Sequence, residues 1–230
     1  MAHVLANVAT GVSPMSLPGR LLIWGAGGHA KVVADVARAS EWEIVAFLDD
    51  DPSKQGQLFY GAPVRGAQTL TPTPSPGGRG EPECSVFVAI GNNAARERCL
   101  VQVLASGRQI PTLIDPSARV SPTAVLSPGT VVMAGAVVQA DTRIGLGGIV
   151  NTGASVDHDC ILGTCVHIAP GARLTGQVSV GDRTLIGAGA VVIPLVRIGA
   201  DNIIGAGAAV VKDTPDGVTL VGVPARRLGT

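Results

Sequence analysis

The segment with the clearest chemical potential is Asp157-His158-Asp159, a histidine between two acids. An imidazole has an ordinary pKa of about 6.5, so near neutral pH it can remove a proton from an attacking amine or hydroxyl. A neighbouring carboxylate can fix the tautomer of the ring and raise its basicity. Taken alone, the segment is also typical of a surface histidine between solvated acids. His158 is therefore a candidate general base, with Asp159 or Asp157 as the carboxylate that orients it.

A second candidate site is the glycine turn Gly25-Ala26-Gly27-Gly28-His29-Ala30, which fits the pattern G-x-G-x-x-A. It follows an apolar stretch and precedes a helical pattern with apolar residues at 32, 33, 36 and 37. In such a turn, backbone N–H groups and the helix N-terminus bind phosphate, and an acid further along binds a ribose hydroxyl. Asp49 and Asp50 are placed for that role. The pattern is compatible with NAD, with another nucleotide, or with a tight turn that binds nothing.

Cysteine and histidine usage argues against other chemistries. The cysteines at 84, 99, 160 and 165 match neither a disulfide scaffold nor a zinc motif, so we expect a reducing compartment, the cytoplasm. The histidines at 3, 29, 158 and 167 are too scattered for a tetrahedral site, and we expect no metal. Cys160 and Cys165 are expected to be packing residues. A cysteine nucleophile is disfavoured because none has a plausible activating base beside it.

The overall composition excludes two kinds of partner. Lys+Arg and Asp+Glu balance at 17 each, so no summed positive charge would attract nucleic acid or an anionic membrane. No run of 18 apolar residues is present, so nothing is predicted to span a bilayer. The length of 230 residues suits one or two compact domains.

The elements around the glycine turn predict a small α/β domain over residues 20–110. A strand, the turn, a helix and a second strand ending in acids form a βαβ beginning, and a later strand meets a turn at Gly91 before another helix. This length allows only a half-Rossmann-like domain, not a six-stranded dinucleotide fold. Residues 1–19 are expected to be a disordered or artificially added tail, and the Pro/Gly-rich residues 71–83 a surface loop.

From Ile114 the sequence follows a period of six. All 17 positions from Ile114 to Val210 taken at steps of six are Ile, Leu or Val, although these types make up only 31 of the 97 residues. Neither a helix, with period 3.6, nor an ordinary strand, with period 2, produces this pattern. It predicts a parallel β-helix over residues 111–213, with three six-residue sides per coil of 18 and one inward aliphatic per side. His158 and Gly176, 18 residues apart, should then be stacked.

These features together resemble a known family. The hexapeptide repeat resembles the left-handed β-helix acyltransferases. Together with WGAGGHAKVVADVA, FLDDD, NTGASVDHDCILGTCVHIAPGARLTG and DGVTLVGVPARRL, it resembles the sugar O- and N-acetyltransferases that acetylate sialic acid and UDP-4-amino sugars of the bacillosamine type. The resemblance extends over residues 20–228. The chain departs from it in the N-terminal tail, in the 71–83 loop, and in having Asp rather than Glu after the central histidine.

The resemblance implies a role for each candidate residue. His158 would be the base, supported by Asp159, and the Gly176 N–H would stabilise the oxyanion. His167 would contact the thioester end of acetyl-CoA, Ala188 and Ala206 would leave room for its pantetheine arm, and the 214–230 segment, with Pro224 and Arg226 or Arg227, would border its adenine end. Gly27, Gly28, His29, Asp49, Asp50 and Gly91 would line a site for a nucleotide-linked amino sugar. Sites shared between neighbouring subunits would make the protein a homotrimer.

The sequence thus favours an acetyl-CoA-dependent N-acetyltransferase acting on the 4-amino group of a nucleotide-linked amino sugar, by direct transfer to the amine. O-acetylation of a sialic acid is the nearest alternative. A non-catalytic β-helix scaffold that binds a nucleotide is another, and it would show no specific binding of acetyl-CoA.

Overall fold

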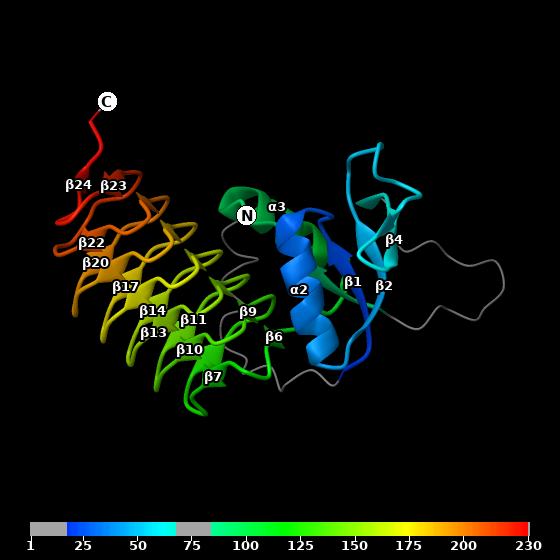
Figure 1. Ribbon diagram of the computed structural model, residues 1–230, viewed down its shortest axis with the longest axis horizontal. Coiled ribbons are helices and arrows are strands. Elements are labelled where there is room, and N and C mark those ends of the chain that lie inside the picture. Colours follow the sequence, from blue (N-terminus) through cyan, green and yellow to red (C-terminus); the bar gives the residue numbers. More distant parts are fainter. Residues whose placement is uncertain (1–17, 68–83, 230) are drawn as a thin grey trace.

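The computed structural model describes residues 18–67 and 84–229, which form two domains side by side (Figure 1). Most of the expected tail and the whole expected loop at 71–83 lie outside the described residues; Pro18 and Gly19 are described and exposed. In the described part of the chain, no helix has both the length and the apolar character needed to cross a membrane.

The N-terminal domain is the predicted α/β unit. Its five-stranded sheet has the order β3-β4-β2-β1-β5, parallel except for the β3–β4 hairpin. Helix α2 packs its small apolar stripe, which includes Ala30, Val33 and Ala37, on one face of this sheet, and α3 covers the other face with Leu100 and Val103. Val32, expected in the stripe, is 42% exposed. The elements are β1 (Arg20–Trp24), α2 (Gly28–Ala39), β2 (Glu43–Leu48), β3 (Leu58–Phe59), β4 (Ala62–Arg65), β5 (Ser85–Val88) and α3 (Asn93–Ala105).

The second domain is a parallel β-helix, as the period of six predicts. Each coil contributes one two-residue strand to each of three parallel sheets, and neighbouring strands in a sheet are 18 residues apart, as in the pairing of Val138 with Val156. The strands are β6 (Leu113–Ile114), β7 (Arg119–Val120), β8 (Val125–Leu126), β9 (Val131–Val132), β10 (Val137–Val138), β11 (Arg143–Ile144), β12 (Ile149–Val150), β13 (Ser155–Val156), β14 (Ile161–Leu162), β15 (His167–Ile168), β16 (Arg173–Leu174), β17 (Ser179–Val180), β18 (Leu185–Ile186), β19 (Val191–Val192), β20 (Arg197–Ile198), β21 (Ile203–Ile204) and β22 (Ala209–Val210).

The three sheets form the sides of a prism. We call the sheet containing β7, β10 and β13 the first side, that containing β8, β11 and β14 the second side, and that containing β6, β9, β12 and β15 the third side. The C-terminal strands β23 (Thr219–Val221) and β24 (Arg226–Arg227) extend the third side as an antiparallel pair.

The aliphatic column predicted from the sequence forms the core of the prism. The 14 positions from Val132 to Val210 are at most 3% exposed, and the first three, Ile114, Val120 and Leu126, pack against them. Burial of each such side chain contributes about 1.5–3 kcal/mol, and stacking lets every coil share this contribution with its neighbours.

Adjacent residues of β14 provide a test of this arrangement. Leu162 points inward and is 3% exposed, whereas Ile161 points outward and is 56% exposed. We expect Leu162→Ala to lower the free energy of unfolding by about 2–5 kcal/mol, because it leaves a cavity in the core. Ile161→Ala, which removes a similar side chain from the surface, should change it by about 0.5 kcal/mol or less. Denaturant unfolding of both variants measures the difference; equal losses would contradict the inward ladder.

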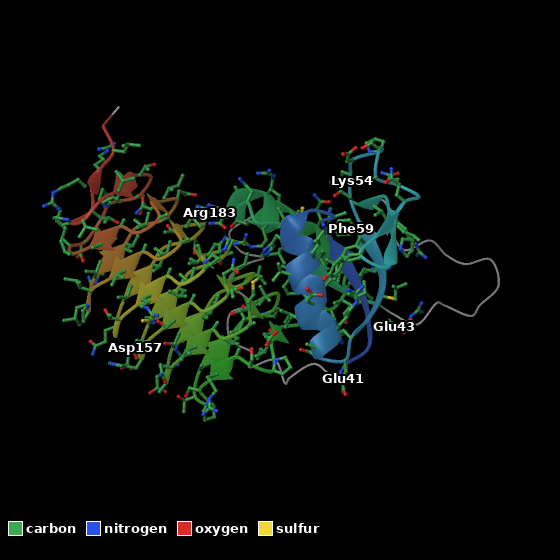
Figure 2. All side chains as sticks on the ribbon, in the orientation of Figure 1. Glu41, Glu43, Lys54, Phe59, Asp157 and Arg183 are labelled. Carbon is green, nitrogen blue, oxygen red and sulfur yellow. The ribbon has the colours of Figure 1, made fainter. Side chains whose placement is uncertain are left out.

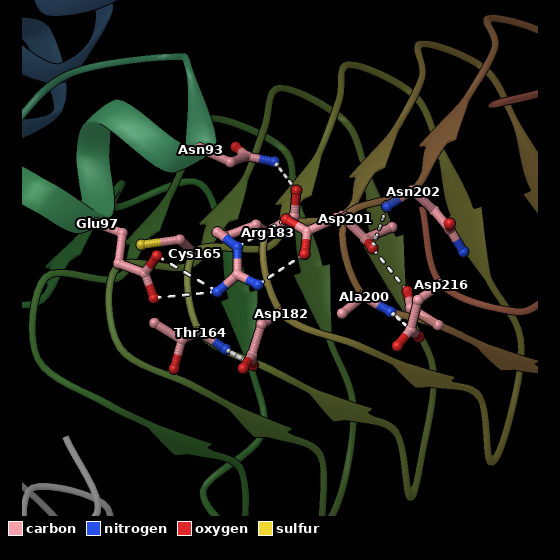
Figure 3. Close-up of polar contacts among 12 residues, drawn as sticks. Asn93, Glu97, Thr164, Cys165, Asp182, Arg183, Ala200, Asp201, Asn202 and Asp216 are labelled. Atoms are coloured by element: carbon pink, nitrogen blue, oxygen red, sulfur yellow. Dashed lines mark hydrogen bonds and ion pairs between the residues drawn. The ribbon is translucent and has the colours of Figure 1, made fainter. Parts of the chain in front are cut away.

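The N-terminal domain docks on the third side and on the corner that precedes it. Outward residues of the first coils, Leu113, Val131 and Ile149, belong to the same buried cluster as α2. Helix α3 lies along the corner between the second and third sides (Figure 3). There Asn93 donates to the Arg183 carbonyl (2.8 Å), and Arg183 pairs with Glu97 (3.3 Å) and Asp201 (2.7 Å). Gly147 is required at this corner because a Cβ there would lie 2.3 Å from Leu100 of α3.

Candidate active site

His158 lies in the corner that joins β13 on the first side to β14 on the second. The corner is held by its neighbours in the stack: the Asp159 N–H donates to the Ala140 carbonyl (3.0 Å), and the Gln177 N–H donates to the His158 carbonyl (2.9 Å). Thr142, one coil earlier, donates its hydroxyl to the Asp157 carbonyl (2.6 Å). Asp159 itself has a φ of 57°, in the left-handed region that turns the chain. The backbone under His158 is therefore fixed by the repeat.

The two acids beside His158 make different contacts. Asp159 Oδ2 lies 2.8 Å from His158 Nδ1, whereas Asp157 Oδ1 accepts the backbone N–H of His158 (2.9 Å). The hydrogen bond to Asp159 is the main reason that the pKa of His158 is raised above its ordinary value. With Nδ1 occupied, Nε2 is the atom left to take a proton from a substrate. The structure thus pairs the ring with Asp159; the sequence left this choice open.

Gly176 lies directly against the His158 ring, as the 18-residue spacing predicts. A Cβ at Gly176 would be 2.6 Å from both Cε1 and Nε2 of His158. Its carbonyl accepts the Leu195 N–H, while its own N–H has no hydrogen-bond partner among the described residues. Glycine at this position therefore leaves room for the ring and an unbonded N–H next to it.

His167 has surroundings that its sequence position did not predict. It begins β15 on the third side, where the N-terminal domain covers it, and its ring centroid is 6.2 Å from that of His29. Asn151 Nδ2 lies 3.1 Å from His167 Nε2, and the Gly91 backbone also hydrogen-bonds the ring. Burial, with Arg96 and His29 nearby, lowers the pKa of His167 to about 4, so the ring is neutral at physiological pH. Sequence reasoning missed Asn151, although it opens the NTGASVDHDC segment that carries the resemblance.

His29 is the residue of the glycine turn nearest to the β-helix. Burial, followed by the charge of Arg96, lowers its pKa to about 4. Its Nε2 is buried and has no hydrogen-bond partner among the described residues. A neutral imidazole with one unsatisfied nitrogen beside an open glycine turn is suited to bind a polar ligand atom.

Asp49 and Asp50 behave differently. Asp49 accepts the N–H groups of Ala26 and Asp51 (both 3.0 Å) and pairs with Lys54 Nζ (2.9 Å). Partial burial would raise the pKa of Asp49, but these hydrogen bonds outweigh it and hold the pKa below its usual range. Asp49 therefore braces the glycine turn, and the exposed Asp50 is the acid left free to meet a ligand. Lys54 was not singled out from the sequence.

The glycine turn presents an open helix N-terminus. Gly27, the N-cap of α2, provides no side-chain hydrogen bond, and the first turn contains no acid. By contrast, Asn92 caps α3 by accepting the Ala95 N–H (2.9 Å). Gly27, Gly28 and Gly91 are exposed, and a Cβ at any of them would meet nothing within 4 Å. Free N–H groups and a helix dipole without a competing acid suit a phosphate group.

The remaining candidates lie near the C-terminal end of the β-helix. Ala188 and Ala206 are exposed one coil apart at the corner between the third and first sides, where the Gly207 N–H donates to the Ala188 carbonyl (2.8 Å). Pro224, Arg226 and Arg227 are exposed in the C-terminal segment, and Arg226 donates to the Ala225 carbonyl (2.9 Å).

The candidate residues therefore form separate groups within one chain. The His158 corner joins the first and second sides, so it lies opposite the third side, which carries His167 and the N-terminal domain. Figure 2 shows this separation, with Asp157 at one edge of the β-helix and Arg183, next to α3, at the other. A site that uses both groups requires a second copy of the chain.

The structure describes no metal-binding group of three or more His, Cys, Asp or Glu residues in residues 18–67 and 84–229. Burial raises the pKa of Cys99 and of Cys165 to about 11, which makes both poor nucleophiles at neutral pH.

Comparisons with known proteins agree with this architecture. The family described as the PglD N-terminal domain matches residues 20–103. The acetyltransferase domain of PglB from Neisseria gonorrhoeae FA1090, in complex with acetyl coenzyme A, is 45% identical, with 91% of this chain and 98% of that chain covered and a TM-score of 0.83. A variant of perosamine N-acetyltransferase from Caulobacter crescentus, in complex with CoA and GDP-perosamine, is 43% identical, with 95% and 100% covered and a TM-score of 0.85.

A third solved structure, WeeI from Acinetobacter baumannii AYE, is 28% identical, with 91% of this chain and all of that chain covered and a TM-score of 0.81. Similarity of this extent covers both domains of the protein, and two of the relatives exceed 40% identity. The chain belongs to the family of hexapeptide-repeat sugar acetyltransferases.

Proposed function

We propose that the protein transfers the acetyl group of acetyl-CoA to the 4-amino group of a nucleotide-linked amino sugar. The observation that carries the proposal is the exposed His158 ring, bonded through Nδ1 to Asp159 and packed on Gly176. This is a base with a fixed tautomer next to an unbonded N–H. The relatives crystallised with acetyl coenzyme A, and with CoA and GDP-perosamine, support the choice of both substrates.

The chemistry follows from this geometry. The sugar amine attacks the thioester carbonyl, and His158 Nε2 removes the amine proton as the C–N bond forms. Asp159 stabilises the imidazolium. The Gly176 N–H donates to the oxyanion of the tetrahedral intermediate. The C–S bond then breaks, and the proton held by His158 passes to the departing thiolate, so free CoA and the N-acetyl sugar leave without an acyl-enzyme.

Binding of the two substrates uses the other groups. The open N-terminus of α2 at Gly27 and Gly28 binds the diphosphate, with Asp50, Gly91 and the unsatisfied His29 Nε2 directed to the rest of the nucleotide sugar. His167 meets the thioester end of acetyl-CoA, the exposed Ala188 and Ala206 accommodate the pantetheine arm, and Pro224 and Arg226 border the adenine end. Arg226 is suited to pair with a phosphate.

We further propose a homotrimer in which neighbouring copies complete each site. Within one chain the His158 corner faces away from the N-terminal domain, as described above. Apolar side chains are exposed around this corner: Ile161 is 56% exposed, Ile193 40% and Leu195 66%. Contact with a second chain would cover these side chains and bring its N-terminal domain to His158.

The direct test is thiol release from acetyl-CoA with a panel of UDP-, GDP- and dTDP-linked 4-amino sugars, with sialic acid as a hydroxyl acceptor. We expect turnover with at least one amino sugar and a product acetylated on nitrogen. Turnover with sialic acid alone would replace the proposal with O-acetylation. Absence of acetyl-CoA binding by calorimetry would reject both in favour of a scaffold.

The contacts of the two acids predict different pH profiles. In Asp159→Asn the hydrogen bond that raises the pKa of His158 is weakened, so the acid limb of kcat moves to lower pH. The plateau should fall about tenfold or more, because the base is weaker and less well oriented. In Asp157→Asn the amide oxygen can still accept the backbone N–H, and we expect a smaller shift. Rate profiles between pH 5 and pH 9 measure both; a larger effect at Asp157 would contradict the assignment.

Sharing of sites between copies can be measured by mixing two inactive variants. His158→Ala and Asp50→Ala, both at exposed side chains, are unfolded separately, mixed in equal amounts and refolded together. If each site combines His158 of one copy with the N-terminal domain of another, random mixing restores about one quarter of the wild-type activity. If each site lies within one chain, no activity returns. Each variant refolded alone is the control.

A further inference from the structure

Arg96 of α3 is a buried charged residue for which the proposed chemistry has no use. Its side chain is 1% exposed, and its donors reach five oxygens. Nε donates to the Gly147 carbonyl (2.8 Å), NH1 to the carbonyls of Ile90 (2.9 Å) and Gly91 (3.2 Å), and NH2 to the Cys165 carbonyl (2.7 Å) and Asn93 Oδ1 (2.8 Å). None of these contacts is a carboxylate, so backbone oxygens provide most of its compensation for burial.

These contacts join two parts of the proposed site. Ile90 and Gly91 follow β5 in the N-terminal domain, and Gly91 is a proposed nucleotide-sugar contact. Gly147 and Cys165 occupy successive coils at the corner of the β-helix, and Cys165 lies two residues before His167, the proposed thioester contact. The Gly91 backbone, one of the acceptors of Arg96, also hydrogen-bonds the His167 ring.

We propose that Arg96 is a positioning residue, which sets the nucleotide-sugar loop at Gly91 in register with the β-helix coil that carries His167. This rests on the proposed function for the roles of Gly91 and His167. A planar guanidinium with fixed donor directions can hold four carbonyls from two domains in one frame, whereas the single ammonium of lysine cannot. Arg96 is also the nearby cation that helps to keep both His29 and His167 neutral.

Arg183 provides a matched control, because it also links α3 to the same corner of the β-helix. It does so through the ion pairs with Glu97 and Asp201 and has no printed contact with Gly91 or His167. Its side chain is 27% exposed, and pairs of this kind contribute little to stability. Arg183→Gln therefore weakens domain docking without releasing the Gly91 loop.

The test compares Arg96→Lys, Arg96→Met and Arg183→Gln in the full-length protein. The substrate is the nucleotide-linked amino sugar that the wild type acetylates fastest. We expect Arg96→Lys to raise the KM for this sugar about tenfold or more, because a small misplacement of a binding loop has a large effect. Arg96→Met should raise it further, and Arg183→Gln should stay within about threefold. A purely structural loss would lower kcat by reducing the active fraction, with both KM values unchanged.

Hydrogen exchange gives a readout that does not depend on activity. Amides at positions 91–93 should exchange faster in Arg96→Lys than in the wild type, and should be unchanged in Arg183→Gln. If the wild type acetylates no amino sugar, the proposed function fails and the exchange measurement still tests Arg96. Unchanged KM values together with unchanged exchange in folded Arg96→Lys would overturn the proposal. An equal KM increase in Arg183→Gln would also overturn it, because the effect would then be one of docking.

Discussion

Replacing His158 with alanine should lower kcat for acetyl transfer by about 10²–10⁴-fold, the contribution of a positioned general base. The reason lies in the arrangement of the ring: Nδ1 is held by Asp159, so Nε2 has no replacement when the imidazole is removed. The KM for acetyl-CoA should change little, because the proposed contacts of that substrate lie elsewhere. Thiol release from acetyl-CoA in the presence of an amino-sugar acceptor is the measurement.

The fold should tolerate this change. His158 is 53% exposed, and its corner is fixed by backbone hydrogen bonds that alanine retains. Gln139→Ala, at an exposed position of the same corner one coil earlier, is the control and should keep near-normal turnover. If His158→Ala retains turnover within about threefold of the wild type, His158 is not the base and the proposed chemistry fails.

Adding a single methyl group at Gly176 should lower kcat by about 10²-fold or more. The new Cβ would lie 2.6 Å from two atoms of the His158 ring, and the ring must move to accommodate it. Movement of the ring weakens its hydrogen bond to Asp159, so the pKa of His158 should fall back toward its ordinary value. The backbone of Gly176 does not have the positive φ that would make alanine strained, so the effect is steric.

Steady-state kinetics and NMR titration of the His158 ring measure these two effects. Gly229→Ala is the matched control, because a Cβ there would meet nothing within 4 Å. A normal rate in Gly176→Ala with an unchanged His158 pKa would show that the ring does not rest on this residue. A lower rate with an unchanged pKa would still support the proposed use of the Gly176 N–H.

Much of the fold was predictable because it is written in a repeating pattern. A β-helix buries one aliphatic side chain every six residues, and each coil pairs only with its neighbours, so the period of the sequence determines the register of all three sheets. The same register placed Gly176 against His158 before any coordinates were known. The βαβ beginning was predictable for a similar local reason, since a strand, a glycine turn and an amphipathic helix follow one another in the chain.

The roles of particular polar residues were less accessible to the sequence. Asp49 and Asp50 are adjacent and identical in type, yet one braces the glycine turn and the other is exposed. Asp157 and Asp159 were equivalent neighbours of His158 until the left-handed backbone of Asp159 directed its carboxylate to the ring. These differences depend on side-chain direction, which the spacing of residues does not specify.

By itself, the sequence determined the two-domain order, the inward column of the β-helix and the stacking of Gly176 on His158, because each of these depends on contacts at a fixed and short spacing. Only the tertiary structure decided how the domains meet. It placed His167 under the N-terminal domain beside His29, and it buried Arg96 among carbonyls of both domains. Such contacts join residues 50 to 140 positions apart with no repeating spacing, so they arise from how two finished surfaces pack together.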